Sequence, residues 1–166
     1  IFDTRIDGTK WQQEHWKSIT LNYAKAPFFD EICSLIEPFY KLNCSKLSEL
    51  NTKLLIAICN YLGIQTKISD SNYYKLIGEK SEKLLNICIE SGASSYISGP
   101  SAKEYLNTKI FEDKNIKVEW FNYNNYKPYP QLWGEFESGV SVLDLLFNCG
   151  AKSKHYLFNA RKFNSS

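Results

Sequence analysis

The sequence has 166 residues, of which 43% are hydrophobic and 23% charged, enough to build a substantial hydrophobic core. Its net charge is only +2 and its arginines are limited to Arg5 and Arg161, so the clustered basic surface of a nucleic-acid-binding protein is missing. Because it holds neither an apolar run of about 20 residues nor a signal-peptide pattern, we expect a single cytoplasmic domain over residues 1–166, with no membrane span and no nucleic-acid partner.

The first third of the chain has the pattern of helices. The segment 11–23 places Trp11, His15 and Ile19 on one stripe and ends before Pro27, which disfavours a helix in the residue before it. A second, less regular helix is predicted over 27–40, interrupted or started again at Pro38. A third is predicted over 48–62, with Ser48 as the candidate N-cap and Gly63 as the stop.

The period of the pattern then changes. We predict strands at 64–69, 95–98 and 116–121, with helices at 79–90 and at about 101–106 between them. This β-α-β-α-β order indicates an α/β fold, with a parallel, Rossmann-like three-layer sheet after an α-helical N-terminal portion. The segment 122–130, rich in Asn, Tyr and Pro, is predicted to be a loop.

Ligands of parallel sheets bind at the carboxyl ends of the strands, which draws attention to Ser98 and Gly99. Glycine lets the backbone approach a ligand, and the start of the following helix favours an anion such as a phosphate. The alternative is that Ser98 only caps that helix. The sequence lacks the GxGxxG and GxxxxGK[ST] motifs, so it does not indicate a standard dinucleotide or P-loop site.

The two histidines differ in their surroundings. His15 lies between Trp11 and Trp16, and its imidazole would suit proton transfer at neutral pH, although packing is the alternative role. His155 lies among lysines near the C-terminus and is predicted to be solvated. Five cysteines without CxxC spacing, and histidines far apart, argue against a metal site and for reduced, mostly buried thiols.

Aromatic and amide side chains crowd the segment before the last helix. Tyr123, Tyr126, Tyr129 and Trp133 lie there, next to Gln131. Rings that stack and amides that donate two hydrogen bonds are typical of sugar or nucleobase sites, but also of lids packed on a core. Both interpretations stay open for Tyr129 and Gln131.

Three polar residues share one face of the apolar helix predicted after Gly139. Ser141, Asp144 and Asn148 fall at i, i+3 and i+7. Burying a carboxylate without a partner is costly, so Asp144 either faces a site or forms a capping box with Ser141 as the N-cap. A cap does not account for Asn148, one turn further along.

The chain resembles the WbqC-like protein family. The resemblance rests on five blocks in the family's order and spacing, which are His15-Trp16, residues 22–27, Ser98-Gly99-Pro100, Tyr129-Pro130-Gln131 and residues 141–150. Members of this family begin with a further strand and loop. Because the chain opens on Ile1 and contains no methionine, we expect it to be incomplete at its N-terminus.

The resemblance implies a role in bacterial surface-polysaccharide (O-antigen) biosynthesis. The implied activity is a transferase that adds an acyl or aminoacyl group, such as glycyl, to a nucleotide-linked amino sugar. His15 would then be the general base and Asp144 its orienting carboxylate, while Ser98, Gly99, Tyr129, Gln131, Ser141 and Asn148 would bind the sugar nucleotide. The alternative is a non-catalytic protein that binds a sugar nucleotide or a carrier. No metal is expected, and the sequence indicates no other cofactor and no oligomeric state.

Overall fold

The computed structural model describes residues 3–123, 126–158 and 164–165, and it divides into two compact units. The first unit comprises Ile1–Gln65 and Tyr126–Ala160, and the second comprises Thr66–Asn125 and Arg161–Ser166. The first is helical, whereas the second contains the sheet. The expectation that the chain is a single domain stays a prediction, which the unfolding of the chain tests.

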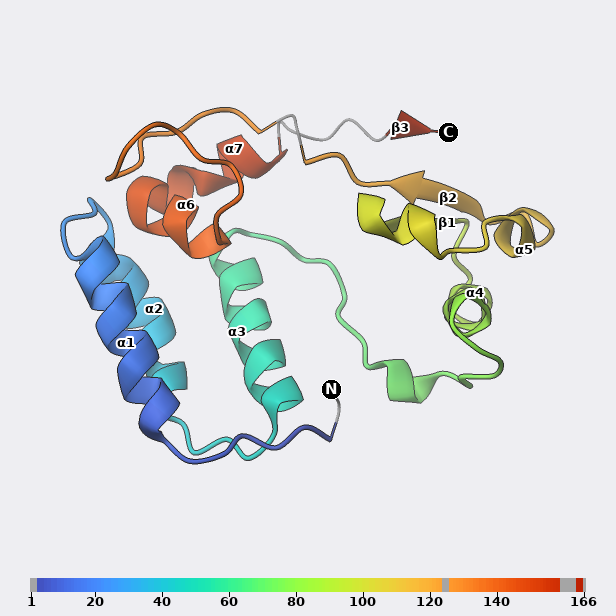
Figure 1. Ribbon diagram of the computed structural model, residues 1–166, viewed down its shortest axis with the longest axis horizontal. Coiled ribbons are helices and arrows are strands. Elements are labelled where there is room, and N and C mark those ends of the chain that lie inside the picture. Colours follow the sequence, from blue (N-terminus) through green and yellow to red (C-terminus); the bar gives the residue numbers. More distant parts are fainter. Residues whose placement is uncertain (1–2, 124–125, 159–163, 166) are drawn as a thin grey trace. The chain divides into compact units, whose positions relative to one another are not determined.

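Three long helices lie side by side in the first unit, with two short ones at the end where α1 stops and α2 starts (Figure 1). The helices are α1 (Lys10–Tyr23), α2 (Phe29–Lys41), α3 (Leu47–Tyr61), α6 (Val142–Cys149) and α7 (Ser153–Phe158), with a 3-10 turn, η3 (Gly150–Lys152), between the last two. The three helices predicted in the first third of the chain are therefore confirmed.

The ends of these helices follow from local chemistry. Pro38 lies inside α2, which continues through it to Lys41. The helix α3 begins at Leu47, so Ser48 is within the helix and is not its N-cap. It ends as predicted at Gly63, whose φ of +71° allows the amides of Gly63 and Ile64 to donate to carbonyls of the last turn at 3.0 and 2.8 Å.

Aromatic stacking joins α1 and α2 to α6. Phe147 is fully buried, and its ring stacks on Tyr23 at 4.5 Å and on Phe29 at 5.9 Å between centroids. The amide of Phe28 also donates to the carbonyl of Phe147 at 3.1 Å. The core of this unit therefore forms where the end of the chain packs on the start of α2.

The second unit alternates short helices and strands. Its elements are η1 (Ser71–Tyr73), α4 (Ser81–Glu90), β1 (Ser95–Ser98), η2 (Pro100–Glu104), α5 (Lys109–Glu112), β2 (Lys117–Trp120) and β3 (Asn164–Ser165). The predicted strand 95–98 and the helix predicted over 79–90 are confirmed, the helix with a later start. The helix predicted at about 101–106 is a shorter 3-10 helix, and the strand predicted over 116–121 is shorter by one residue at each end.

The sheet is small. β1 and β2 pair in parallel from Ser95 with Lys117 to Ser98 with Trp120, which confirms the predicted parallel pair. β3 pairs with β2 in the antiparallel sense. In the described residues the sheet thus has order β1-β2-β3 with one antiparallel strand: the mixed α/β class is confirmed, whereas a full Rossmann-like three-layer sheet is not shown.

The segment 64–69, predicted as the first strand, lies outside any helix or strand. It carries the chain from the first unit to the second. Its alternation of apolar and polar residues is real, but Ile68 is 42% exposed, so the alternation does not correspond to a buried face. A strand is stable only when its backbone pairs with a neighbour, and no pairing of this segment occurs among the described residues.

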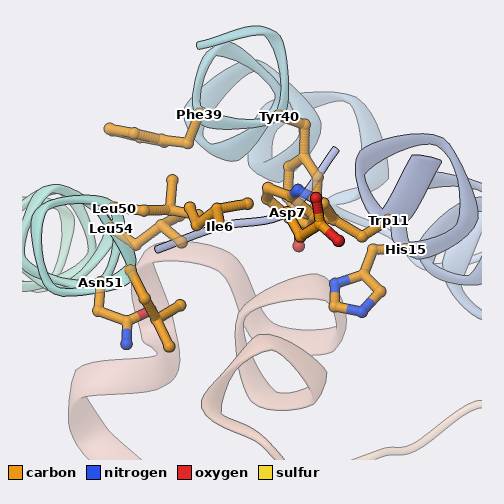
Figure 2. A pocket seen from close by; sticks show the side chains of 10 residues that line it. Ile6, Asp7, Trp11, His15, Phe39, Tyr40, Leu50, Asn51 and Leu54 are labelled. Atoms are coloured by element: carbon orange, nitrogen blue, oxygen red, sulfur yellow. The ribbon is translucent and has the colours of Figure 1, made fainter. Parts of the chain in front are cut away.

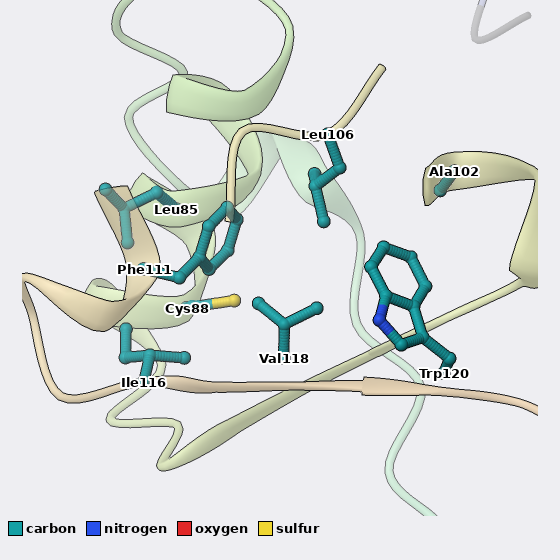
Figure 3. Packing of buried hydrophobic residues seen from close by; sticks show 8 residues of the cluster. All are labelled: Leu85, Cys88, Ala102, Leu106, Phe111, Ile116, Val118 and Trp120. Carbon is teal, nitrogen blue, oxygen red and sulfur yellow. The ribbon is translucent and has the colours of Figure 1, made fainter. Parts of the chain in front are cut away.

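A separate hydrophobic core supports the sheet (Figure 3). It consists of Leu85, Cys88, Ala102, Leu106, Phe111, Ile116, Val118 and Trp120. Phe111 of α5 is fully buried and stacks on Tyr96 of β1 at 5.3 Å. The helices α4 and α5 therefore cover the sheet with their apolar side chains.

No helix in the described part of the chain is long and apolar enough to cross a membrane. All five cysteines are free, and Cys88 and Cys149 are buried while the other three are half-buried.

Candidate functional site

An open cavity of about 410 Å³ lies in the first unit, among α1, α2, α3 and the segment before α1. Ten residues line it, namely Ile6, Asp7, Trp11, His15, Phe39, Tyr40, Leu47, Leu50, Asn51 and Leu54. The segment before α1 is held in place by backbone hydrogen bonds, from Ile6 to Ser45 and from Leu47 to Thr4, each of 3.0 Å. These bonds fix Ile6 and Asp7 against the start of α3.

One end of the cavity combines aromatic and titratable side chains (Figure 2). Trp11 and His15 lie one turn apart on α1, with ring centroids 5.5 Å apart in an edge-to-face arrangement. Tyr40 of α2 lies 5.9 Å from Trp11 and 6.4 Å from His15. Asp7 brings a carboxylate to the same end. Burial raises the pKa of Tyr40, which keeps its hydroxyl protonated and able to donate.

The other end of the cavity is mostly apolar. Phe39, Leu50 and Leu54 gather there, and Ile6 lies between the two ends (Figure 2). Asn51 supplies the one amide of the lining. The cavity therefore offers a polar and an apolar half to the same ligand.

The carboxylate of Asp144 forms a second, buried cluster in the first unit. Asp144 is 8% exposed, and its Oδ1 accepts hydrogen bonds from the Tyr129 hydroxyl at 2.8 Å and from Nε2 of Gln131 at 2.9 Å. Gln131 also bonds the backbone of Glu137 through both ends of its amide, at 2.8 and 2.9 Å. The network thus ties the segment before α6 to the first turn of that helix.

Tyr23 of α1 belongs to the same cluster. Burial, the negative charge of Asp144 and a hydrogen bond to it raise the pKa of Tyr23 to about 12. Burial and the hydrogen bond to Asp144 likewise raise the pKa of Tyr129. Both phenols are therefore held as neutral donors, and Asp144 is stabilised by donors without a cation.

Ser141 and Asn148 have structural partners. The Ser141 side chain caps α6 by accepting from the amide of Leu143 at 3.3 Å, as predicted. Asp144 does not complete a capping box, since its carboxylate turns to Tyr129 and Gln131. Asn148 donates from Nδ2 to the carbonyl of Asp144 at 2.8 Å, which satisfies it within the helix.

His15 and Asp144 do not meet. His15 lies two turns before Tyr23, or about 12 Å along α1, whereas Tyr23 bonds Asp144. No hydrogen bond or ion pair joins the two residues in the described part of the chain. The structure therefore does not bond Asp144 to His15, because the contact of α1 with Asp144 comes from its last residue, Tyr23, and His15 lies near the middle of the helix.

Ser98 and Gly99 lie in the second unit, at the end of β1. The backbone of Gly99 is extended, and an added Cβ would meet only the Tyr123 hydroxyl at 3.6 Å, an ordinary contact. The helix that follows, η2, has five residues and so lacks the dipole of a long α-helix. Phosphate binding at Ser98 and Gly99 stays a prediction.

The sequence pointed to His15 as a candidate site residue and placed Trp11 on the same stripe, but it did not reveal the residues opposite them. Asp7, Tyr40 and Asn51 come from three other segments, and no local motif marks them. The signal in the sequence for these residues was the stripe of Trp11 and His15 on α1. Such a stripe has to pack against side chains of a neighbouring helix, but it does not say which ones. Among the described residues, no three His, Cys, Asp or Glu side chains gather as a metal site.

The fold and these sites define a mixed α/β protein whose helical unit carries an aromatic-lined cavity and a buried carboxylate network. The chain belongs to the WbqC-like protein family, whose model matches residues 1–156, and the resemblance found in the sequence is confirmed. It is 45% identical over 163 residues to a protein of Mycobacterium tuberculosis (strain ATCC 25618 / H37Rv) described as uncharacterized protein Rv1507c, an alignment that covers 98% of this chain and 71% of that protein. No solved structure matches the chain.

Proposed function

We propose that the chain is a transferase that adds an acyl or aminoacyl group to the amine of a nucleotide-linked amino sugar, within bacterial surface-polysaccharide biosynthesis. The observation that supports this most is the polar end of the cavity, where an imidazole, a carboxylate and two aromatic rings line one space. Sugars bind proteins by stacking their apolar faces on such rings. The pathway is the one that the resemblance to the WbqC-like family implies, and the family match itself names no reaction.

Each side chain at this end has a proposed task. Trp11 and Tyr40 hold the sugar ring, and Asp7 binds its ammonium group through a charge-assisted hydrogen bond. His15 acts as the general base. At about 410 Å³ the cavity is near the lower limit for ligand pockets, so it takes the sugar and the transferred group and leaves the nucleotide outside.

The reaction balances with an activated acyl thioester as the donor. His15 removes one proton from the ammonium, and the free amine attacks the thioester carbonyl carbon. The C–N bond forms, the C–S bond breaks, and the second nitrogen proton passes to the leaving thiolate. The products are the amide and a thiol, while the proton held by His15 is released to water.

We assign the residues around Asp144 to holding the segment before α6 in position. Tyr129, Gln131, Ser141 and Asn148 bond Asp144 or the start of α6, so they fix the segment before that helix. They support the packing of Phe147 on α1 and α2, and through it the helices that line the cavity. None of these residues lines the cavity.

The test uses UDP-glucosamine as acceptor and S-acetyl-N-acetylcysteamine as donor. His15→Gln is expected to lower kcat by about 100-fold or more with little change in the Kd of the acceptor, because a general base acts in the transition state. Asp7→Asn is expected to weaken UDP-glucosamine binding about 10-fold or more and to leave UDP-N-acetylglucosamine, which has no ammonium, unaffected.

The matched control is His155→Gln, at the other histidine, which lies outside the cavity. Asp144→Asn is expected to lower stability while the folded protein keeps its kcat. Wild-type rates in both His15→Gln and Asp7→Asn would remove the cavity from the mechanism.

The alternative is a protein that binds a sugar nucleotide without catalysis. One observation favours it, since His15 has no carboxylate bonded to its ring in the described part of the chain, whereas a general base usually has an orienting partner. Saturable binding of UDP-glucosamine with no amide product under any donor would establish this alternative.

A further inference from the structure

We propose that the apolar end of the cavity binds the transferred group, and that this group is a short aliphatic acyl chain and not an aminoacyl group. The inference rests on the proposed function for the identity of the acceptor. It rests on the cavity itself for the nature of the acyl group.

The lining of the cavity is divided between a polar and an apolar end. Leu50 and Leu54 are one turn apart on α3 and form one wall, and Phe39 of α2 lies near them (Figure 2). Leu50 is 5% exposed, so this part of the wall is shielded from solvent. Ile6 connects the apolar wall to the polar end.

A charged group is costly to bury at the apolar end. A glycyl group carries an ammonium, and among the lining residues this end offers it no carboxylate, only the neutral amide of Asn51 beside Leu54. Moving an unpaired ammonium out of water against leucine and phenylalanine side chains is strongly unfavourable. A methylene, in contrast, gains about 0.8 kcal/mol on burial, or about a fourfold increase in affinity.

The positions of the two ends also limit where the acyl chain can lie. A thioester carbonyl carbon that reacts with an amine held between Asp7 and His15 must lie near Ile6, between the two ends. Its acyl chain then points either to solvent or towards Leu50 and Leu54. The apolar wall makes the second direction the favourable one.

The test measures the binding of donor mimics to the whole chain by calorimetry. The probes are the S-acetyl, S-butanoyl and S-glycyl thioesters of N-acetylcysteamine. We expect the butanoyl probe to bind about 15-fold more tightly than the acetyl probe, from two buried methylenes, and the glycyl probe to bind more weakly than either. Equal affinity for acetyl and butanoyl, or tightest binding of glycyl, would overturn the proposal.

Two variants locate the effect. Leu54→Asn is expected to abolish the gain from acetyl to butanoyl. Leu55→Asn is the matched control, since Leu55 is the next residue of α3, is 49% exposed and does not line the cavity. A readout that needs no variant is methyl NMR, in which the butanoyl probe should shift the methyl signals of Ile6 and Leu54. Shifts confined to other methyl groups would also contradict the proposal.

The outcomes separate this inference from the proposed function. If the thioesters show the chain-length gain but UDP-glucosamine does not bind, the acyl assignment stands and the amino-sugar acceptor is wrong. If UDP-glucosamine binds and is acylated but chain length has no effect, the proposed function stands and the apolar end has another role.

Discussion

At the scale of residues, Asp144 shows how a carboxylate is kept in an apolar helix. Its partners are the neutral donors Tyr129 and Gln131, from the segment before α6, and Tyr23, from the end of α1. Hydrogen bonds to a charged acceptor are stronger than neutral ones, and together they replace the water that burial removes. Tyr23 and Tyr129 can donate these hydrogen bonds only while their hydroxyls are protonated. The packing of the first unit therefore depends on the protonation of both side chains.

The first prediction is a loss of stability at alkaline pH. The pKa of Tyr23 is raised from 10.0 to about 12 in the folded state, so its contribution is fully present below pH 10 and is lost as the pH rises through 12. The pKa of Tyr129 is also raised in the folded state, so its contribution to stability is likewise lost at alkaline pH. Denaturant unfolding at a series of pH values should show the free energy of unfolding fall over this range.

The variant Tyr23→Phe keeps the ring that stacks on Phe147 and should reduce the fall with pH. Part of the fall in the free energy of unfolding should remain in this variant, because burial and Glu31 also raise the pKa of Tyr61. Tyr73→Phe is the control, because Tyr73 is 84% exposed. A pH dependence identical in wild type and Tyr23→Phe would contradict the role of the cluster.

The second prediction concerns Gly150, between α6 and α7. Its φ is +53°, and an added Cβ would overlap the ring of Phe28, with Cε1 at 2.6 Å and Cγ at 2.7 Å. Gly150→Ala should therefore destabilise the protein by about 3 kcal/mol or more, from backbone strain and overlap together. Gly63→Ala is the control, with a φ of +71° and no atom within 4 Å, and should lose only about 1 to 2 kcal/mol. Equal losses in chemical denaturation would be inconsistent with a packing role for Gly150.

At the scale of elements, sequence periodicity predicted helices well because a helix satisfies its own backbone. The stop at Gly63 and the start of α6 at Ser141 were also predicted, since both depend on local residues. The segment 64–69 was mispredicted because a strand depends on partners that its own residues do not encode. Ser48 was mistaken for a cap for a related reason, as the bridge between Arg5 and Lys46 sets the start of α3.

The third prediction concerns Pro38 in α2. Proline has no amide hydrogen to donate within the helix, and it directly precedes Phe39 and Tyr40 of the cavity. Pro38→Ala should stabilise the protein by up to about 3 kcal/mol, and ligand binding should report any effect on the neighbouring cavity residues. Denaturation and calorimetry with UDP-glucosamine measure the two effects. Glu37→Ala, which removes a surface ion pair with Lys41, should change stability by less than about 1 kcal/mol. Unchanged or lower stability in Pro38→Ala would contradict this account.

At the scale of the whole molecule, the chain leaves the first unit, forms the second and returns. The segment Tyr126–Ala160 completes the first unit only after Thr66–Asn125 has intervened. A compact second unit shortens the loop that must close, which lowers the entropic cost of completing the first. The cavity could not be predicted from the sequence because its walls come from four segments, whereas His15 and Trp11 were visible as neighbours on one helix.

The fourth prediction is that the two units unfold in a single transition. Phe147→Ala in the first unit and Phe111→Ala in the second each remove a fully buried ring and should cost about 3 to 5 kcal/mol. Because loop closure couples the units, both variants should shift one shared transition, seen alike by circular dichroism and by tryptophan fluorescence. Two separated transitions, each sensitive to one variant, would show that the units are independent domains.

The network around Asp144 has a consequence for how related proteins are compared. Tyr129, Gln131 and Asp144, which carry much of the resemblance to the family, hold a segment of chain against a helix. This hydrogen-bond network does not contact the contents of the cavity. Two proteins can therefore share the network and still bind different molecules. If the cavity binds the substrate as proposed, a change of substrate should accompany changes at Asp7, Asn51 and Leu54, and members that differ there are the ones to test with other acceptors and donors.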